Sequence, residues 1–275
     1  MLATMHGKQQ AIAPALREQP GLEVTLPEGL DTDRLGTFSG EVERQGNMLD
    51  TAIAKARMGM ELTGLKLGIA SEGSFGPHPQ VPFMAAGVEL LVLVDDELGL
   101  VITEQQVFAD TNYAHATGRS ATDLSAFAET AGFPDHALIV RPNQPADGCG
   151  LIHKGIRRHD ELEKAVSGCA AASADGLALV QTDMRAHVNP GRMTAIAILA
   201  SRFASRIATL CPACTSPGYG PSDSISGLPC EWCGEPSTLV RWIIHRCPAC
   251  RHEARLPRPD GLLKSDPMHC LSCNP

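Results

Sequence analysis

Eight of the ten cysteines in this chain stand in four Cys-x-x-Cys pairs near the C-terminus. The pairs are Cys211/Cys214, Cys230/Cys233, Cys247/Cys250 and Cys270/Cys273. One pair offers two thiolates from a single turn, and two pairs supply the four soft ligands of a tetrahedral Zn²⁺ site. The stretches between the pairs hold 15, 13 and 19 residues, close to the spacing that is typical of zinc sites. The cysteines therefore predict two bound zinc ions.

The number of pairs does not fix how they combine. We prefer consecutive pairing, in which the first pair joins the second and the third joins the fourth, because each loop then keeps a usual length. A disulfide framework is the alternative, but no other feature of the chain indicates secretion. A site closed by four cysteines has no open coordination position and is structural. We expect residues 209–275 to form a zinc-ribbon-like module that depends on metal to fold.

The composition limits the class of protein. The chain has 275 residues, of which 43% are hydrophobic, and this suits one sizeable domain, assigned to residues 1–208, plus the small module. The segment from Met1 to Lys8 lacks a signal-peptide pattern, and no apolar run approaches the roughly 18 residues of a membrane span. Thiol-rich metal pairs favour a reducing compartment, so we predict a cytoplasmic protein without membrane contact.

The charge distribution disfavours a nucleic-acid partner. Residues 1–204 hold 16 Lys/Arg against 25 Asp/Glu, and residues 205–275 hold 7 against 6. Each zinc ion bound by four thiolates adds about two negative charges, so the loaded module is also acidic. A module that grips phosphate backbones usually has a basic face. Zinc ribbons do often bind nucleic acid, and this interpretation stays as an alternative.

Hydrophobic periodicity predicts an α/β domain with a mixed sheet flanked by helices. Helices are expected over residues 8–18, 47–63, 121–131, 159–168 and 190–208, and strands over 1–4, 22–26, 67–70, 88–94, 100–107, 137–140 and 177–180. Gly64 suits the end of the second helix, and Asn189 and Pro190 suit the start of the last. The Gly-rich stretch 71–76 is expected to leave the sheet, and residues 27–46 are expected to form a loop.

Polar residues that could bind phosphate follow two of the expected strands. Thr4, His6 and Lys8 lie in a loop that enters a helix, where backbone N–H groups and the helix dipole favour anions. Glu72 follows the strand 67–70 and is a candidate Mg²⁺ ligand or base. Candidates for a second carboxylate are Glu41, Glu43 and Asp50. An ordinary turn and a solvated acidic loop are the alternatives.

A third polar segment, residues 182–192, opens the last helix. Arg185 and Arg192 carry guanidinium groups that could clamp phosphate or a base edge. Asp183 could orient Arg185 or bind a metal, and His187 could transfer protons. A capped helix start with local ion pairs is the alternative. The most basic window of the domain, residues 153–159, suits an anionic ligand or forms a solvated face.

Taken together, these segments resemble the inosine/xanthosine triphosphate pyrophosphatase superfamily. The best match is Gly46-Asn47-Met48-Leu49-Asp50-Thr51-Ala52-Ile53-Ala54-Lys55-Ala56-Arg57, followed by Leu62-Thr63-Gly64 and Gly68-Ile69-Ala70-Ser71-Glu72-Gly73. The family has a Glu-Asn-Ala-x-x-Lys-Ala helix and then a strand that ends in an acidic-Ser-Gly turn. The loop from Thr4 to Lys8 is similar to the family's opening Thr-x-Asn-x-x-Lys phosphate loop. The whole chain also resembles a bacterial family of unassigned activity with the same four-pair tail.

The resemblance implies roles for individual residues. Lys55 would contact a triphosphate, and Glu72 would hold Mg²⁺ or activate water. The departures are that the opening loop is one residue short and has His6 near the place of its Asn, and that Asp50-Thr51 replaces Glu-Asn. The family's late Ser-His-Arg motif is absent in that form, and Arg185, His187 and Arg192 are candidates to replace it.

The leading functional hypothesis is therefore a Mg²⁺-dependent nucleoside triphosphate pyrophosphatase-like hydrolase that acts on a phosphorylated small molecule. In this hypothesis Thr4, His6, Lys8, Lys55, Arg185 and Arg192 bind phosphate, and Glu72 and Lys55 take part in catalysis. The alternative is a non-catalytic nucleotide sensor or regulator whose zinc tail docks a protein or nucleic-acid partner. The resemblance also implies a homodimer.

Overall fold

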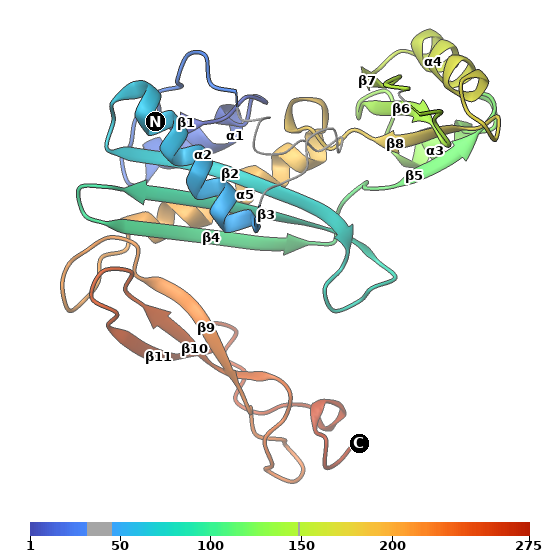
Figure 1. The fold of residues 1–275 in the computed structure, drawn as a ribbon. Coiled ribbons are helices and arrows are strands. Elements are labelled where there is room, and N and C mark those ends of the chain that lie inside the picture. The colour runs from blue at the N-terminus through green and yellow to red at the C-terminus, as the bar shows by residue number, and fades with distance from the viewer. Residues whose placement is uncertain (32–45, 148) are drawn as a thin grey trace.

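The structure is a computed structural model that describes residues 1–31, 46–147 and 149–275. Its strands form three sheets, and helices flank the first two (Figure 1). The predicted fold class, a mixed α/β architecture followed by a small cysteine-rich module, is confirmed. Within the described ranges, no helix combines the length and the apolar character that crossing a bilayer requires.

The first sheet has the strand order β1-β2-β3-β4. Its members are β1 (Leu2–Ala3), β2 (Leu67–Pro77), β3 (Ala85–Asp95) and β4 (Leu100–Phe108). β1 runs parallel to β2, and the other neighbours are antiparallel. The sheet is therefore mixed, and the loop that leaves β1 emerges beside the middle of β2.

Helices cover both faces of this sheet. On one face α2 (Met48–Thr63) buries Ala52, Ala56 and Met60 against Ala70 and Val92. On the other face α1 (Gln9–Glu18) and α5 (Pro190–Ala208) pack on each other and on the sheet. This second core contains Ile12, Leu16, Ile69, Leu91, Ile196, Leu199 and Phe203. Aliphatic side chains at helical spacing thus build both cores, as the periodicity predicted.

The predicted helix ends are present. Asn47 accepts a hydrogen bond from the Asp50 N–H at 2.9 Å at the start of α2, and Gly64 ends that helix with a φ of 69°. Asn189 accepts from the Arg192 N–H at 3.0 Å at the start of α5, and Pro190 is the first residue of that helix. Arg192 is therefore held in the first turn of α5 by a cap that the sequence predicted.

The predicted end of β2 at residue 70 is wrong. β2 continues through the Gly-rich stretch to Pro77, with Glu72 opposite Leu90 and Gly73 opposite Glu89 in β3. A Cβ atom at Gly73 would lie 2.6 Å from the Glu89 Oε1 atom, so the glycine makes room for side chains that pack over the strand. The expected strand over residues 22–26 is also not formed, although Thr25 O accepts a hydrogen bond from Leu2 N at 2.9 Å.

A second sheet lies between β4 and α5 in the chain. It has the antiparallel order β5-β8-β6-β7, with β5 (His115–Gly118), β6 (Leu138–Pro142), β7 (His153–Ile156) and β8 (Ala178–Thr182). The helices α3 (Ser125–Thr130) and α4 (His159–Ala171) contribute to its core. The region predicted as one domain over residues 1–208 thus contains two sheets. Its boundary at residue 208 stays a prediction.

The third sheet is the C-terminal module. It is an antiparallel meander of β9 (Gly220–Ser226), β10 (Val240–Arg246) and β11 (Glu253–Pro257), with β10 in the centre. The 3-10 turn η3 (Pro267–His269) precedes the last cysteine pair of this module. A second 3-10 turn, η2 (Ala186–Val188), lies outside the module and precedes α5. The module projects away from the two other sheets, and the C-terminus lies at its far end (Figure 1).

Candidate functional site

The eight paired cysteines form two clusters, and the pairs combine crosswise. The first cluster joins Cys211 and Cys214 to Cys247 and Cys250; the second joins Cys230 and Cys233 to Cys270 and Cys273. In each cluster the four Sγ atoms lie within 4.8 Å of one another. The predicted zinc ligands are therefore brought together in two groups of four, but the consecutive pairing that we preferred is wrong.

The meander explains the crosswise pairing. The first cysteine pair precedes β9, the second lies between β9 and β10, the third lies between β10 and β11, and the fourth follows β11. Because neighbouring strands run in opposite directions, alternate connections lie at the same end of the sheet. The first and third pairs therefore meet at one end, and the second and fourth pairs meet at the other.

The sulfur distances fit zinc rather than disulfides. Sγ atoms of different pairs lie 3.8 Å apart for Cys211 and Cys250, and 3.6 Å apart for Cys214 and Cys247. The corresponding distances in the second cluster are 3.9 and 3.6 Å. A tetrahedral ion with metal–sulfur bonds of about 2.3 Å separates its ligands by roughly 3.8 Å, whereas a disulfide joins sulfurs at about 2.05 Å. The two clusters could each hold one zinc ion in a closed, structural site.

All four pairs use the same backbone turn. The N–H group four residues after the first cysteine donates to that cysteine's carbonyl oxygen, at distances of 2.8, 3.0, 3.1 and 2.8 Å. The donors are Thr215, Gly234, Arg251 and Asn274. Three of these residues have a positive φ, between 60° and 77°. This turn exposes two thiolates on one side, which is the geometry that a metal needs and that the Cys-x-x-Cys spacing predicted.

A separate cluster of charged residues lies in the first sheet and around it. Lys8 Nζ donates to Ser71 Oγ at 3.0 Å, Lys55 forms an ion pair with Glu72, and Arg192 Nε donates to Glu89 Oε1 at 2.6 Å. The side chains of Lys55 and Glu72 are 12% and 5% exposed, and Lys8, Glu89 and Arg192 are also buried. Four residues predicted from separate segments, Lys8, Lys55, Glu72 and Arg192, thus belong to one polar cluster, which we call the charged cluster.

The charged cluster straddles the sheet. Successive residues of a strand point to opposite faces, so Ser71 and Gly73 face α1 and α5, whereas Glu72 faces α2 and reaches Lys55. Lys8, which directly precedes α1, lies in the connection from β1 to α1 and interacts electrostatically with charged groups on both faces. The prediction that Glu72 follows the end of a strand is therefore wrong, because Glu72 lies within β2.

Burial lowers the pKa of Lys8. The pKa of the Lys8 ammonium falls to about 8 because it is removed from water and lies near Arg192 and Lys55. The nearby carboxylates of Glu89 and Glu72 oppose this shift. A lysine that is half-protonated near pH 8 can respond to a negatively charged ligand, because such a ligand stabilises its charged form.

Arg192 and Glu89 form the most buried ion pair of the charged cluster. Arg192 also donates to Met184 O, and its guanidinium lies 5.2 Å from the centre of the Phe75 ring. Sequence reasoning did not predict Glu89, the polar exception in the otherwise apolar stretch 88–94 that was expected to form a strand. That exception was the available signal, because a carboxylate in a central strand needs a buried cation as its partner.

Three other predicted phosphate ligands lie in different surroundings. The rings of His6 and His187 stack with their centres 5.2 Å apart. Arg185 pairs with the fully buried Asp183 at 2.6 Å, as the interpretation of local ion pairs at the helix start expected. The Thr4 Oγ1 atom is buried and accepts or donates no hydrogen bond within the described ranges.

The surroundings of Asp183 connect this segment to the second sheet. Asp183 Oδ2 accepts a hydrogen bond from Gly155 N at 3.1 Å, and Gly155 belongs to β7. The pKa of His187 is lowered by burial and by the positive charge of Arg185, with Asp183 acting in the opposite direction. The basic window at residues 153–159 is divided between β7 and the start of α4.

Of the other carboxylates considered, Asp50 is exposed at the start of α2, and Glu41 and Glu43 lie outside the described residues.

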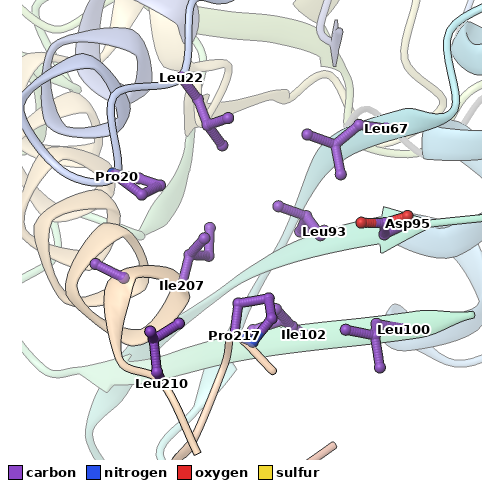
Figure 2. A pocket seen from close by; sticks show the side chains of 11 residues that line it. Pro20, Leu22, Leu67, Leu93, Asp95, Leu100, Ile102, Ile207, Leu210 and Pro217 are labelled. Atoms are coloured by element: carbon purple, nitrogen blue, oxygen red, sulfur yellow. The ribbon is translucent and has the colours of Figure 1, made fainter. Parts of the chain in front are cut away.

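Two hollows lie near these elements. One, of about 420 Å³, adjoins Arg192 at the start of α5 and is lined by Phe108, Asn112, His136 and Asn189 among others. The other, of about 500 Å³, is almost wholly apolar and contains none of the predicted ligand residues (Figure 2). In Figure 2 the side chains of Leu22, Leu93, Ile102 and Ile207 surround it, and Asp95 is its single acidic group. The first hollow is therefore the one that adjoins the charged cluster.

The fit of a magnesium ion to the charged cluster is limited. Glu72 is paired with Lys55, and Glu89 is paired with the buried Arg192. Within the described ranges, groups of three or more His, Cys, Asp or Glu ligand atoms are formed by the two cysteine clusters. Mg²⁺ often takes one or two protein carboxylates and completes its shell with substrate phosphates, so a magnesium role for Glu72 would need a phosphorylated ligand and stays a prediction.

The fold and the sites define an α/β protein with a buried charged cluster and a C-terminal module of two four-cysteine clusters. The family model described as "Domain of unknown function (DUF6671)" matches residues 55–275, and the chain belongs to this family. The match includes Lys55, Glu72, Glu89, Arg192 and all eight paired cysteines. No curated protein and no solved structure matches the chain.

Proposed function

We propose that this protein hydrolyses a phosphorylated small molecule, with a nucleoside triphosphate as the first candidate. One observation carries the proposal: the buried cations Lys8 and Arg192 and the largely buried Lys55 gather around β2 and β3 in a region whose overall charge is acidic. Burying cations is costly unless they have a function or complete partners. Two carboxylates accompany three cations, so the charged cluster has an excess of positive charge when all five groups are ionised.

A phosphate group near Lys8 would relieve the cost of that residue's burial. Its pKa of about 8 means that Lys8 is largely protonated at pH 7 but loses its proton readily. A bound polyphosphate would hold the proton on Lys8, and Lys55 could move from Glu72 toward the same anion. Lys8 also directly precedes α1, where the helix dipole favours negative charge.

The residues beside Arg192 suit a planar ligand group. The ring of Phe75 lies 6.0 Å, centre to centre, from both Phe108 and Tyr113, and Arg192 lies over Phe75. The chain contains only 7 Phe, 2 Tyr and 2 Trp residues, so three neighbouring aromatic rings, one of them under Arg192, form a notable concentration. Aromatic rings and guanidinium groups stack on bases. The hollow of about 420 Å³ that Phe108 and Arg192 line has room for such a group.

Glu72 has the central role in the proposed reaction. The Glu72 carboxylate and the phosphate oxygens of the ligand would together hold Mg²⁺. The ion would offset the negative charge that develops on the phosphate oxygens during hydrolysis. When the ligand draws Lys55 away, the Glu72 carboxylate becomes available for this role. Hydrolysis at the α-phosphate would release pyrophosphate, whose charge Lys8 and Lys55 are placed to balance.

The test is release of pyrophosphate and phosphate from common and deaminated nucleoside triphosphates by zinc-loaded protein, with and without Mg²⁺. We expect turnover that falls by about 100-fold or more in Glu72→Gln. The matched control is Glu61→Gln, which changes an exposed glutamate of the same α2 region and should leave turnover unchanged. Turnover that survives Glu72→Gln in folded protein would refute the role assigned to Glu72. If no nucleotide of the panel releases pyrophosphate or phosphate, the hydrolase proposal is refuted.

The second candidate function is nucleotide sensing without hydrolysis. The observation that favours it is the ion pair between Lys55 and Glu72, because a carboxylate that stays neutralised cannot serve as a metal ligand or base. In that case a nucleotide should bind at micromolar concentration and stabilise the protein against heat, while no product appears over hours. Calorimetric titration beside the release assay separates the two functions.

A further inference from the structure

The two cysteine clusters differ in the residues between their cysteines. Both pairs of the first cluster enclose Pro-Ala, at residues 212–213 and 248–249. The pairs of the second cluster enclose Glu231-Trp232 and Leu271-Ser272. All four turns make the same backbone hydrogen bond, which does not depend on the two residues between the cysteines, so the clusters do not require this difference. The second cluster therefore carries large apolar side chains for some other reason.

The first cluster is the one that is joined to the α/β region. Gly218, which follows its first cysteine pair, packs closely on Ile102 of β4; a Cβ atom there would lie 2.6 Å from the Ile102 side chain. Arg206 at the end of α5 donates to Pro221 O and lies 3.7 Å from the Glu104 carboxylate. The second cluster lies at the opposite end of the meander, next to the C-terminus (Figure 1).

The segments that carry or contact the cysteines of the second cluster hold exposed apolar side chains, which we call the distal patch. It consists of Trp232, Leu263, Met268 and Leu271, which are 77, 78, 64 and 70% exposed. Backbone hydrogen bonds hold the contributing segments together, from Glu231 N to Ser265 O at 3.0 Å and from Thr238 N to His269 O at 3.0 Å. Single exposed apolar residues are common, but four around one metal cluster indicate an interaction surface.

The charge around the distal patch selects the partner. Residues 227–239 and 261–275 contain three side-chain carboxylates, Glu231, Glu235 and Asp266, and one cation, Lys264. Four thiolates and one Zn²⁺ would add about two further negative charges. The exposed indole of Trp232 also favours contact with a cation.

We propose that the distal patch docks a protein segment in which apolar side chains alternate with Lys or Arg. The apolar side chains would cover Leu263, Met268 and Leu271, and a basic side chain would lie on Trp232. Tryptophan is a frequent energetic centre of such interfaces. An acidic surface repels phosphate backbones, and it repels a second copy of itself, so these two occupants are disfavoured.

The proposal is tested by panning a phage-displayed random dodecapeptide library on the zinc-loaded full chain. We expect an enriched motif that combines Leu, Ile or aromatic residues with Lys or Arg. The corresponding synthetic peptide should bind the wild-type chain and lose at least tenfold in affinity for Trp232→Ser. Phe83→Ser is the matched control, because Phe83 is 89% exposed on a different part of the protein and its replacement should leave the affinity unchanged.

A second readout separates loss of contact from loss of fold. The chain has two tryptophans, Trp232 and Trp242, so Trp242→Phe leaves Trp232 as the only indole fluorophore. Peptide binding should shift the emission of Trp232 to shorter wavelength. Trp232→Ser and Trp242→Phe should each retain two zinc ions per chain. Failure to enrich a motif, a motif without basic residues, or an affinity that Trp232→Ser does not change would overturn the proposal.

Two further measurements decide between the proposed partner and other occupants. Binding of a single-stranded oligonucleotide that Trp232→Ser abolishes would overturn the proposal in favour of nucleic acid. A dimer in sedimentation analysis that Trp232→Ser dissociates would overturn it in favour of a second copy. We expect neither result. The proposal does not depend on hydrolysis at the charged cluster.

Discussion

Replacement of Lys8 by Met should make this protein more stable at neutral pH. Lys8 is buried, and its ammonium donates to Ser71 Oγ at 3.0 Å. Its pKa is lowered from 10.5 to about 8, mainly by burial and then by the charge of Arg192. The folded state therefore holds the Lys8 proton more weakly than the unfolded state, which is the signature of a residue that is kept at a cost in stability.

The size of the effect follows from the pKa. At about 1.36 kcal/mol for each pKa unit, a fall from 10.5 to about 8 corresponds to roughly 3 kcal/mol against folding when Lys8 is charged. Removal of the hydrogen bond to Ser71 would offset about 1 kcal/mol of the gain. We therefore expect Lys8→Met to raise the free energy of unfolding at pH 7 by about 2 kcal/mol.

The direction in which stability changes with pH follows from proton binding at Lys8. Between pH 8 and pH 10.5 the unfolded chain binds more protons at Lys8 than the folded chain, so the stability of the wild type rises with pH over this window. Below pH 8 the full destabilisation by the charged Lys8 side chain is present. At pH 9.5 roughly half of it remains, and the advantage of Lys8→Met should shrink accordingly.

The assay is urea unfolding of zinc-loaded protein, followed by far-ultraviolet circular dichroism at pH 7 and pH 9.5. Tryptophan fluorescence is unsuitable because both tryptophans lie in the C-terminal module. Lys66→Met removes an exposed lysine just before β2 and should change stability by less than about 0.5 kcal/mol. If Lys8→Met is less stable than wild type at pH 7, or if its effect is the same at both pH values, the electrostatic reasoning is wrong.

Other regions of the protein give equally direct predictions. Crosswise pairing predicts that the double variant Cys211→Ser, Cys247→Ser loses one of the two zinc ions, whereas Cys211→Ser, Cys230→Ser loses both; metal analysis of purified protein would contradict the pairing if these results were exchanged. Gly73→Ala should destabilise the first sheet by about 1–3 kcal/mol, because the added methyl group meets the buried pair of Arg192 and its partner; thermal unfolding that is unchanged would rule out this close packing. Arg192→Met should lower the free energy of unfolding by about 3–5 kcal/mol, since it leaves the buried carboxylate of Glu89 without its cation. If the added change Glu89→Gln restores stability, the unpaired carboxylate is the cause.

Much of the fold was predictable because its signals are local. The ends of α2 and α5 follow from Asn47, Gly64 and Asn189, whose side chains or backbone freedom act within one turn. The continuation of β2 through residues 71–77 was not predictable in the same way. Gly73 and its neighbours remain in the sheet because β3 pairs with them along their whole length. That contact is distant in sequence, and it outweighs the weak preference of glycine for strands.

The charged cluster was predictable in its members but not in its pairing. Lys8, Glu72 and Arg192 were identified from polar segments beside expected elements, and Lys55 was identified from the resemblance to the pyrophosphatase superfamily. Their partners depend on which face of β2 each residue occupies, and this required the register with β3. Glu89 was missed because the apolar periodicity of its strand concealed it.

The crosswise pairing of the cysteines changes how the C-terminal module holds together. Consecutive pairing would have created two small loops, each closed by its own metal. In the structure the links from Cys214 to Cys247 and from Cys233 to Cys270 span 33 and 37 residues, and the two spans overlap. Both spans include β10, so a zinc ion in each cluster would fasten one end of the same central strand. Loss of either ion would free one end of β10 and weaken the ligand geometry at the other, and the two clusters therefore stabilise each other through the sheet between them. One end of this unit packs on the α/β region, where Gly218 contacts Ile102 and Arg206 donates to Pro221 O.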